Sequence, residues 1–365
     1  MKRFALAALI LGSLAACTKS NIQYELTEEI SLQPVAEKAT KAAYTGTAYG
    51  DRAPAFNVWA WWADVEPGKS IAEFLSSGKI DSYIDKGEFV HRNNGSWGGT
   101  IPYYWPPEGS LVFAGYSPAS GAIGNFEYYL QGQGTAGQSD YVAPYTFKIT
   151  DYIQSNNIAQ TVDLMWFDRT DISYNSNRNK NSNSQDVNGV PVIFHHALSW
   201  LEFHVIRKND VPANWLVTEL NLTGIETKAD FNSNDTPQWT DQEVPHDIRV
   251  WSGSYLVLPD DPVNGSPGEN VLESTPNGVI IIPQQCAEGK ANLKVTYNLR
   301  KYDGTVDSWL RAQTVTLPLT AGTDGNSWLP GKKYVYTIVF GNNEIRIAPT
   351  VTDWVDEKNL DIEVQ

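Results

Sequence analysis

Cysteine is scarce in this chain, which contains only Cys17 and Cys286 among its 365 residues. Because Cys17 directly follows the leader segment discussed below and is expected to be modified, Cys286 has no partner, and an internal disulfide framework is excluded. The fold must therefore depend on core packing. No basic helix start lies near Cys286 to favour its thiolate, so we expect an inert, buried thiol at this position.

Motifs for catalysis and metal binding are also missing. The chain has no Gly-x-Ser-x-Gly elbow, and the glycine-rich residues 95–99 lack the helix and lysine of a phosphate-binding loop. The five histidines match no zinc spacing, and the adjacent His195 and His196 would point to opposite faces of a strand. We therefore expect no metal, no cofactor and no enzymatic activity. A glycan hydrolase stays open as an alternative, because sequence cannot show whether two carboxylates lie about 5–9 Å apart.

Positive charge is in short supply. The chain carries 42 acidic against 27 basic residues, a formal net charge of −15. Such a surface repels phosphate backbones and anionic lipid, so nucleic acid is not an expected partner. No stretch beyond the first residues is apolar enough to span a membrane as a helix.

The N-terminal segment has the features of an export leader. Lys2 and Arg3 precede an apolar run at residues 4–11, which is shorter than a membrane span of about 20 residues. The run leads to Leu14, Ala15, Ala16 and Cys17, a pattern that resembles the lipobox of bacterial lipoproteins. This resemblance implies that residues 1–16 are a signal peptide and that Cys17 is lipidated. The alternative is an ordinary signal peptide followed by an unrelated cysteine.

The composition predicts an all-β protein. Aromatic residues can supply a large core (13 Trp, 18 Tyr and 12 Phe), while 28 Gly and 20 Pro predict frequent turns and few long helices. One short helical turn is expected at residues 70–76, and a surface loop at residues 121–138. Strands are expected at residues 24–32, 56–62, 103–107, 111–118, 190–205, 215–222, 248–258, 279–282, 293–300, 314–319, 334–340, 344–348 and 351–354.

A polar, low-complexity stretch at residues 174–189 divides the chain. We therefore predict two β-sandwich domains in tandem. The first covers residues 17–189, including a tether and first strand within residues 17–55. The second covers residues 190–365 and ends in a tail at residues 355–365.

Several segments together resemble the fimbrillin-like proteins, which are lipoprotein subunits of protease-assembled pili in Gram-negative gut and oral bacteria. In the second half the similarity lies in Trp328-Leu329-Pro330-Gly331-Lys332-Lys333-Tyr334, Asp353-Trp354, Ile282-Pro283-Gln284 and Val192-Ile193-Phe194-His195-His196. In the first half it lies in Tyr104-Trp105-Pro106 and Phe113-Ala114-Gly115-Tyr116-Ser117-Pro118. The resemblance implies that both domains are transthyretin-like sandwiches.

The same resemblance implies a mechanism of assembly. A trypsin-like protease would cut in the loop after the first strand, and Lys38, Lys41 and Arg52 are candidate sites. Loss of the first strand would open a groove for a strand from another pilus subunit. Leu360, Ile362 and Val364 alternate as such a donor strand requires.

The implied location is the outer membrane and cell surface, as part of a fimbrium, with adhesion to a host or bacterial surface ligand. However, the residues after Cys17, Thr18-Lys19-Ser20-Asn21, lack the acidic cluster that directs some such lipoproteins to the surface. A second reading, a glycan-binding surface lipoprotein, depends on Trp59, Trp61, Trp62, Trp97 and Trp105 as stacking platforms.

Overall fold

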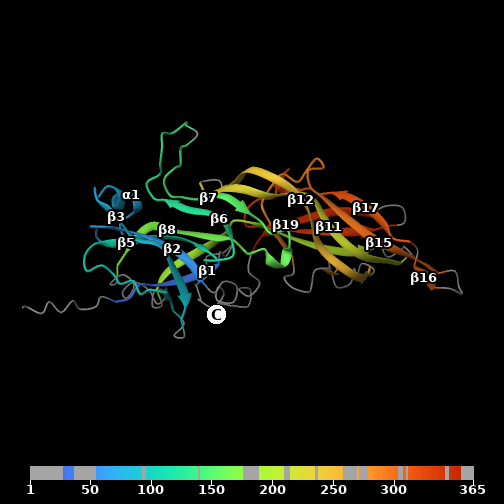
Figure 1. The fold of residues 1–365 in the computed structure, drawn as a ribbon, viewed down its shortest axis with the longest axis horizontal. Helices are drawn as coiled ribbons and strands as arrows, with labels where there is room; N and C mark the ends of the chain where they lie inside the picture. Colours follow the sequence, from blue (N-terminus) through green and yellow to red (C-terminus); the bar gives the residue numbers. More distant parts are fainter. Residues whose placement is uncertain are drawn as a thin grey trace, which may run out of the picture.

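The structure is a computed structural model. It describes residues 28–36, 55–92, 96–138, 140–175, 189–208, 214–234, 237–257, 269–270, 278–302, 307–309, 311–341 and 345–354. Within these ranges the regular structure is almost entirely β, which confirms the predicted all-β class. The molecule is elongated, with the N-terminal strands at one end and the C-terminal strands at the other (Figure 1).

The N-terminal strands form a closed barrel. Going round it, the order is β1 (Ser31–Ala36), β4 (Trp97–Gly99), β3 (Ile80–His91), β2 (Ala55–Ala63), β5 (Ser110–Ser117), β8 (Met165–Tyr174) and β9 (Val190–His196), which pairs again with β1. Every pairing is antiparallel except the one between β1 and β9. The barrel is therefore closed by a single parallel contact between segments far apart in the sequence.

Apolar side chains fill the barrel interior. We call this set the barrel cluster; its buried members are Ile30, Leu32, Phe56, Val58, Ala60, Ile84, Phe89, Trp97, Trp105, Leu111, Phe113, Met165, Phe167, Tyr174, Val190, Val192 and Phe194. Aromatic rings pack closely at its centre, where Phe56 lies 5.2 Å from Trp97 and 5.4 Å from Phe194 between ring centroids. The core packing that the shortage of cysteine requires is therefore largely aromatic here.

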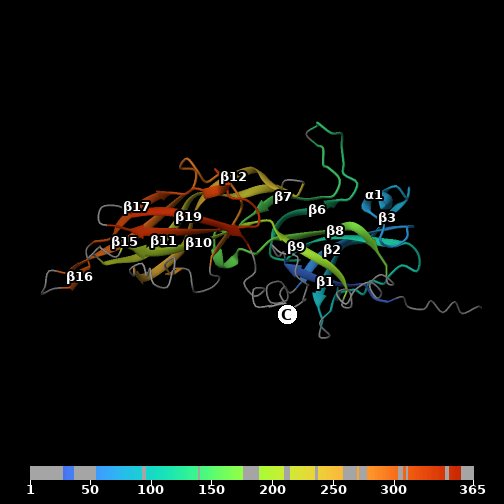
Figure 2. The same cartoon turned by 180° about the vertical axis from the view of Figure 1, so that it is seen from behind.

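Two open sheets make up the rest of the fold. One contains β13 (Glu269–Asn270), β10 (Ser199–Arg207), β18 (Lys332–Phe340), β19 (Ile345–Asp353) and β14 (Val279–Ile281). The other contains β16 (Asp307–Trp309), β15 (Asn292–Tyr302), β11 (Asn214–Asn232), β12 (Gln238–Leu256), β17 (Gln313–Pro318), β7 (Thr146–Ile153) and β6 (Ile123–Tyr129). Two single 3₁₀ turns occur at Ile158–Gln160 and Gly322–Asp324. Figure 2 shows β10 and β19 from the side opposite to that of Figure 1.

The long strand β11 links the two ends of the molecule. Its first part, from Asn214 to Thr223, pairs with β15. Its last part, from Lys228 to Asn232, pairs with β7. Figure 1 shows β11 and β12 running from the C-terminal sheets toward β6 and β7. One sheet therefore contains strands from both halves of the chain, so the halves are joined by backbone hydrogen bonds.

A second apolar cluster lies where the halves meet. This bridging cluster consists of the buried residues Trp59, Ala63, Phe74, Val112, Ala114, Tyr116, Phe126, Tyr128, Leu130, Phe147, Ile149, Tyr152, Leu164, Ala197, Leu198, Ala229, Phe231, Trp239, Ile282 and Trp354. A third cluster, with buried residues of β10, β11, β15 and β18, fills the space between the two open sheets. Strand β2 contributes side chains to two clusters, because Val58 belongs to the barrel cluster and Trp59 belongs to the bridging cluster.

Most expected elements are present. Residues 56–62 and 111–118 lie in β2 and β5, the stretch 293–300 lies in β15, and β18 and β19 form the expected antiparallel hairpin. Sheet membership does not change at residue 189, because β9 pairs with β8 and β1 in the barrel. It changes between β9 and β10.

Three expectations are wrong. The first strand was expected at residues 24–32, but the first described strand is Ser31–Ala36. Residues 24–27 of the expected strand lie outside the described ranges. Residues 103–107 form only an isolated bridge between Glu29 and Tyr104, because the two prolines that follow allow no ladder to continue. The predicted loop at 121–138 contains β6, whose Phe126 and Tyr128 pack into the bridging cluster despite the surrounding glycines.

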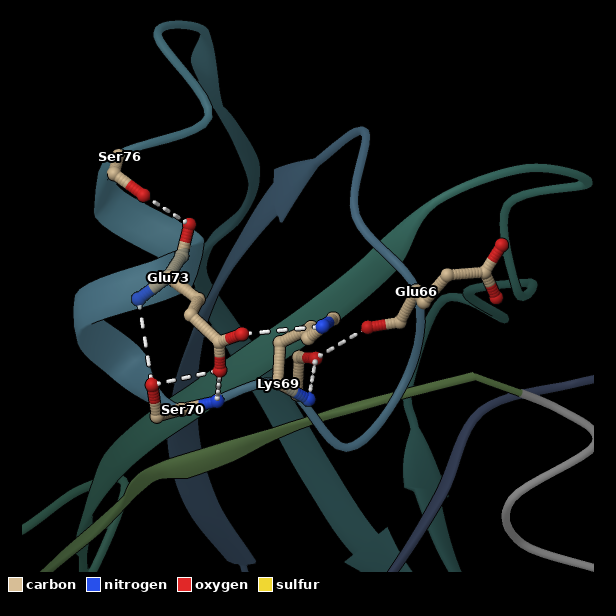
Figure 3. Close-up of polar contacts among 6 residues, drawn as sticks. Glu66, Lys69, Ser70, Glu73 and Ser76 are labelled. Atoms are coloured by element: carbon tan, nitrogen blue, oxygen red, sulfur yellow. Dashed lines mark hydrogen bonds and ion pairs between the residues drawn. The ribbon is translucent and has the colours of Figure 1, made fainter.

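The short helix α1 (Ile71–Leu75) begins with a capping box (Figure 3). Ser70 Oγ accepts a hydrogen bond from the Glu73 backbone N–H, and the Glu73 carboxylate accepts from the Ser70 backbone N–H at 3.0 Å. Lys69 Nζ adds an ion pair with Glu73 at 3.1 Å. The loop before the helix is held to β8 because Ser173 Oγ donates to the Glu66 carbonyl. These contacts fix Phe74, which is fully buried in the bridging cluster.

We expect the Ser70→Ala variant to lower the stability of α1 by about 1 kcal/mol, because the cap to Glu73 N–H is lost. Backbone hydrogen bonding from Ser70 lowers the pKa of Glu73, followed by the contact with Lys69. The ionised Glu73 carboxylate therefore contributes its full stabilisation above the ordinary glutamate pKa. This stabilisation is lost as the pH falls through the lowered pKa of Glu73 in the folded protein. Amide hydrogen exchange at residues 73–75 measures both effects. The Ser77→Ala variant, outside the box, should leave these rates unchanged; equal acceleration in the two variants would contradict the capping role.

Candidate functional site

The predicted processing and donor residues lie outside the described residues. They are Leu14, Ala15, Ala16, Cys17, Lys38, Lys41, Arg52, Leu360, Ile362 and Val364. The described residues instead define the place where the first strand binds. The candidate site is therefore the position of β1 between β4 and β9, which we call the β1 groove.

Strand β1 closes the barrel on both of its edges. On one side Ser31 and Leu32 pair with Gly98 and Trp97 of β4. The segment just before β1 continues this side, because Ile30 N–H donates to the Tyr103 carbonyl and Trp105 N–H donates to the Glu28 carbonyl. On the other side, residues from Leu32 to Ala36 pair in parallel with residues from Val190 to Phe194. Removing β1 would therefore leave strand edges unpaired on β4 and on β9.

The inward side chains of β1 complete the barrel core. Ile30 and Leu32 have no solvent exposure and belong to the barrel cluster, and Pro34 is also buried. These three residues alternate along the strand, as the period of two requires. The groove thus takes up an extended segment through both its backbone and alternate apolar side chains, which are the two components of strand addition.

The parallel pairing between β1 and β9 has fewer backbone N–H donors than a regular β-ladder. Pro34 in β1 and Pro191 in β9 carry no backbone N–H. Among the described residues, the pairing of β9 with its other neighbour, β8, covers Met165–His196 and Trp166–His195. Most of β9 therefore depends on β1 for its pairing within the barrel, at a seam where donors are limited.

An ion pair marks the start of the β1 segment. Arg92, at the end of β3, makes a bidentate contact with Glu29: Nη1 donates to Oε2 at 2.7 Å and Nη2 donates to Oε1. Arg92 Nη2 also donates to the Gly99 carbonyl at 2.9 Å. The two side chains are 32% and 30% exposed, so the pair is partly shielded from solvent.

Glycine makes room for this arginine. A Cβ atom at Gly98 would lie 2.6 Å from Arg92 Cζ, so any side chain there would displace the guanidinium. Gly98 thus allows Arg92 to cross β4 and reach Glu29. Sequence reasoning missed Arg92, and the only signal for it was the unexplained pair Gly98 and Gly99.

The proposed tryptophan platforms are mostly core residues. Trp59, Trp97 and Trp105 are 6%, 2% and 1% exposed, which leaves no ring face for a sugar. Trp61 packs against Tyr128 with a centroid distance of 5.2 Å, and the Trp62 indole donates to the Glu108 carbonyl. Only Trp61 and Trp62 are partly exposed, so the reading as a glycan-stacking surface loses most of its basis.

A cavity of about 420 Å³ is lined by residues 64–67, residues 107–109 and Asn175. Its lining includes Asp64, Glu66, Glu108 and Asn175. Among the described residues no three His, Cys, Asp or Glu side chains gather in a way that could hold a metal ion. Nor does any helix in the described ranges have the length and apolar character to cross a bilayer.

The cysteine and the two adjacent histidines considered in the sequence analysis lie among packed side chains. Cys286 is fully buried, and burial raises the pKa of its thiol to about 11, as expected for an inert thiol. His196 Nδ1 lies 2.9 Å from Asp163 Oδ1, and its ring stacks on Trp354 at 3.9 Å. His195 lies beside Trp166 instead, so the adjacent histidines do point to different surroundings.

Comparison with known proteins gives a consistent result. A sequence model of a family described as fimbrillin-like matches residues 40–354. A search of curated proteins found no match. Among solved structures, a fimbrial protein from Bacteroides vulgatus is similar, with 18% identity, a TM-score of 0.57, and coverage of 90% of this chain and 99% of its own. A proposed cell adhesion protein from Bacteroides uniformis has 13% identity, a TM-score of 0.50, and coverage of 90% and 98%.

Proposed function

This chain belongs to the fimbrillin-like family, and we propose that it is a lipid-anchored pilus subunit or pilus-associated adhesin that assembles by protease-triggered strand exchange. In this proposal Cys17 carries the lipid after removal of residues 1–16, and the protein reaches the outer membrane and the fimbrium. Its partners are other pilus subunits, identical or related, and its role is structural rather than catalytic.

The observation that carries the proposal is the position of β1. This strand is the first described strand of the chain, it pairs with β4 and with β9, and it buries Ile30 and Leu32 in the barrel cluster. Residues 37–54, which connect it to β2, contain Lys38, Lys41 and Arg52. A cut in this connection would turn β1 from a covalent part of the barrel into a bound segment that another strand can replace.

The division into two transthyretin-like sandwiches, with the donor strand at residues 355–365, is part of the same proposal. Two structural features support a rigid subunit of this kind. The strand β11 spans both halves, and the bridging cluster is formed by both. A subunit of this kind would transmit force along the filament through backbone pairing and a shared core.

We expect brief trypsin treatment of the purified precursor to make a discrete cut between residues 36 and 55, followed by polymer formation. The physical reason is that a cut there removes the covalent link that keeps β1 in its own groove. Gel electrophoresis with mass spectrometry locates the cut, and light scattering follows the polymers. An intact product, or complete degradation without a stable fragment, would count against the shaft role.

A matched control replaces the three candidate basic residues together, as Lys38→Gln, Lys41→Gln and Arg52→Gln. This variant keeps every described contact of β1, and it should resist the cut and stay monomeric under the same treatment. Polymer formation by the uncut variant would show that assembly does not need processing in this segment.

A further inference from the structure

The β1 groove places a specific chemical demand on the strand that occupies it. Glu29 faces Arg92, while Ile30 and Leu32 are completely buried and Gln33 is 7% exposed. In order along the strand, the groove therefore accepts a carboxylate, an apolar residue, a variable residue and a second apolar residue, followed by the buried position of Gln33.

The carboxylate is the demanding position. Arg92 lies across Gly98 and donates to the Gly99 carbonyl, so β4 holds its guanidinium in addition to the contact with Glu29. If β1 left, Arg92 would stay beside the empty groove without Glu29. A replacing strand with a carboxylate at this position would restore a bidentate, charge-assisted contact, whereas a cation there would be repelled.

The tail of this chain has the same order of residue types. Asp361, Ile362, Glu363, Val364 and Gln365 follow one another as Glu29, Ile30, Ser31, Leu32 and Gln33 do. Aligned in the same direction as β1, the tail places Asp361 at Arg92, Ile362 and Val364 in the barrel cluster, and Gln365 at the position of Gln33.

Other alignments fit less well. A shift that brings Leu360 to the position of Ile30 places Asn359, a neutral residue, at Arg92. The reversed direction brings Glu363 to Arg92 and also presents apolar residues at the positions of Ile30 and Leu32. It differs in placing the charged Lys358 at the buried position of Pro34, where the first alignment places no residue of the tail. Charge complementarity together with burial therefore favours the direction in which Asp361 meets Arg92.

We propose that Arg92 selects the strand that replaces β1 by pairing with its carboxylate, and that Asp361 of a second copy of this chain supplies that carboxylate. This inference rests on the proposed strand exchange and adds its register, its direction and its selecting residue. Arg92 acts here as a specificity-determining residue for binding between subunits.

Peptide exchange on the nicked protein tests the proposal. A recognition sequence for a site-specific protease, inserted within residues 39–51, allows a cut that leaves β1 bound but not covalently linked. Three peptides of residues 355–365 are then added: the native sequence, the Asp361→Arg sequence and, as a matched control, the Glu363→Arg sequence. Native mass spectrometry follows release of the β1 fragment. Displacement by two peptides is compared as a ratio on the same protein variant, so that any effect of the variant on the affinity of β1 itself cancels.

In the native protein we expect the native peptide to displace β1 about tenfold or more better than the Asp361→Arg peptide, since a partly shielded charge pair is lost. In the Arg92→Glu protein this preference should reverse. The Arg92→Lys protein should keep a weaker preference of the original sign, which guards against misfolding as an explanation. The Glu363→Arg peptide should change the ratio much less in all three.

The outcomes separate this inference from the proposed function. Equal displacement by all peptides, a preference that persists in the Arg92→Glu protein, or reversal by the Glu363→Arg peptide instead would overturn the pairing of Arg92 with Asp361. If full-length nicked protein still polymerises in any of those cases, strand exchange stands without this selection. If neither peptide exchange nor polymerisation occurs, both proposals are wrong.

Discussion

The Leu32→Asp variant is expected to lose the folded N-terminal barrel. Leu32 has no solvent exposure, and its side chain lies in the barrel cluster between β4 and β9. The substitution removes apolar contacts and buries a carboxylate without a partner, changes that together cost more than about 4 kcal/mol. Urea unfolding, combined with amide exchange of β2 and β5, measures the loss.

Leu329→Asp is the matched control, because it makes the same change at a leucine that is 39% exposed. Its free energy of unfolding should stay within about 1 kcal/mol of the parent value. The milder Leu32→Ala variant should fold and lose about 2–5 kcal/mol. If Leu32→Asp retains parental stability, β1 does not complete the barrel core and the groove has no energetic basis.

The Trp354→Ala variant should destabilise the junction between the two halves. The Trp354 ring is 3% exposed, stacks on His196 at 3.9 Å with an interplanar angle of 7°, and meets Trp200 edge-on at 5.1 Å. Its backbone N–H donates to the Gly331 carbonyl at 2.8 Å. Truncating a buried tryptophan of this kind costs about 3–5 kcal/mol. Since residues 355–365 follow directly, assembly should also slow.

Tyr141→Ala provides the control for Trp354→Ala. Tyr141 is also a large aromatic residue, but it is 41% exposed, so its truncation should change the free energy of unfolding by less than about 1 kcal/mol. Thermal unfolding of both variants gives the comparison. A loss below about 1 kcal/mol for Trp354→Ala would mean that the ring stack does not hold the base of the tail in place.

Local patterns in the sequence predicted much of the secondary structure. The alternating residues of β15, the hairpin of β18 and β19, and the short helical turn at residues 70–76 each give a signal within a few neighbouring positions. Strand β6 escaped prediction because Gly121, Gly124 and Gly132 surround it and hide the burial of Phe126 and Tyr128. Pro34 had a similar effect on β1, since proline in a strand normally signals its end.

Pairing between distant segments could not be predicted from the sequence. The parallel contact of β1 with β9 joins Leu32 to Val190, and no local periodicity specifies such a partner. The extension of β11 from β15 to β7 is likewise a consequence of the tertiary arrangement. Arg92 belongs to no motif, and its role depends on a contact with Glu29 that only folding creates.

Amide hydrogen exchange of β9 is the most direct test of whether a neighbouring subunit replaces β1 in its groove, because residues 190–194 pair with β1 along one edge of this groove. We expect slow exchange in the precursor, fast exchange once the cut protein has lost its β1 fragment, and slow exchange again in the assembled polymer. If these amides remain protected without β1, or stay exposed in the polymer, then neighbouring subunits do not bind in the groove between β4 and β9.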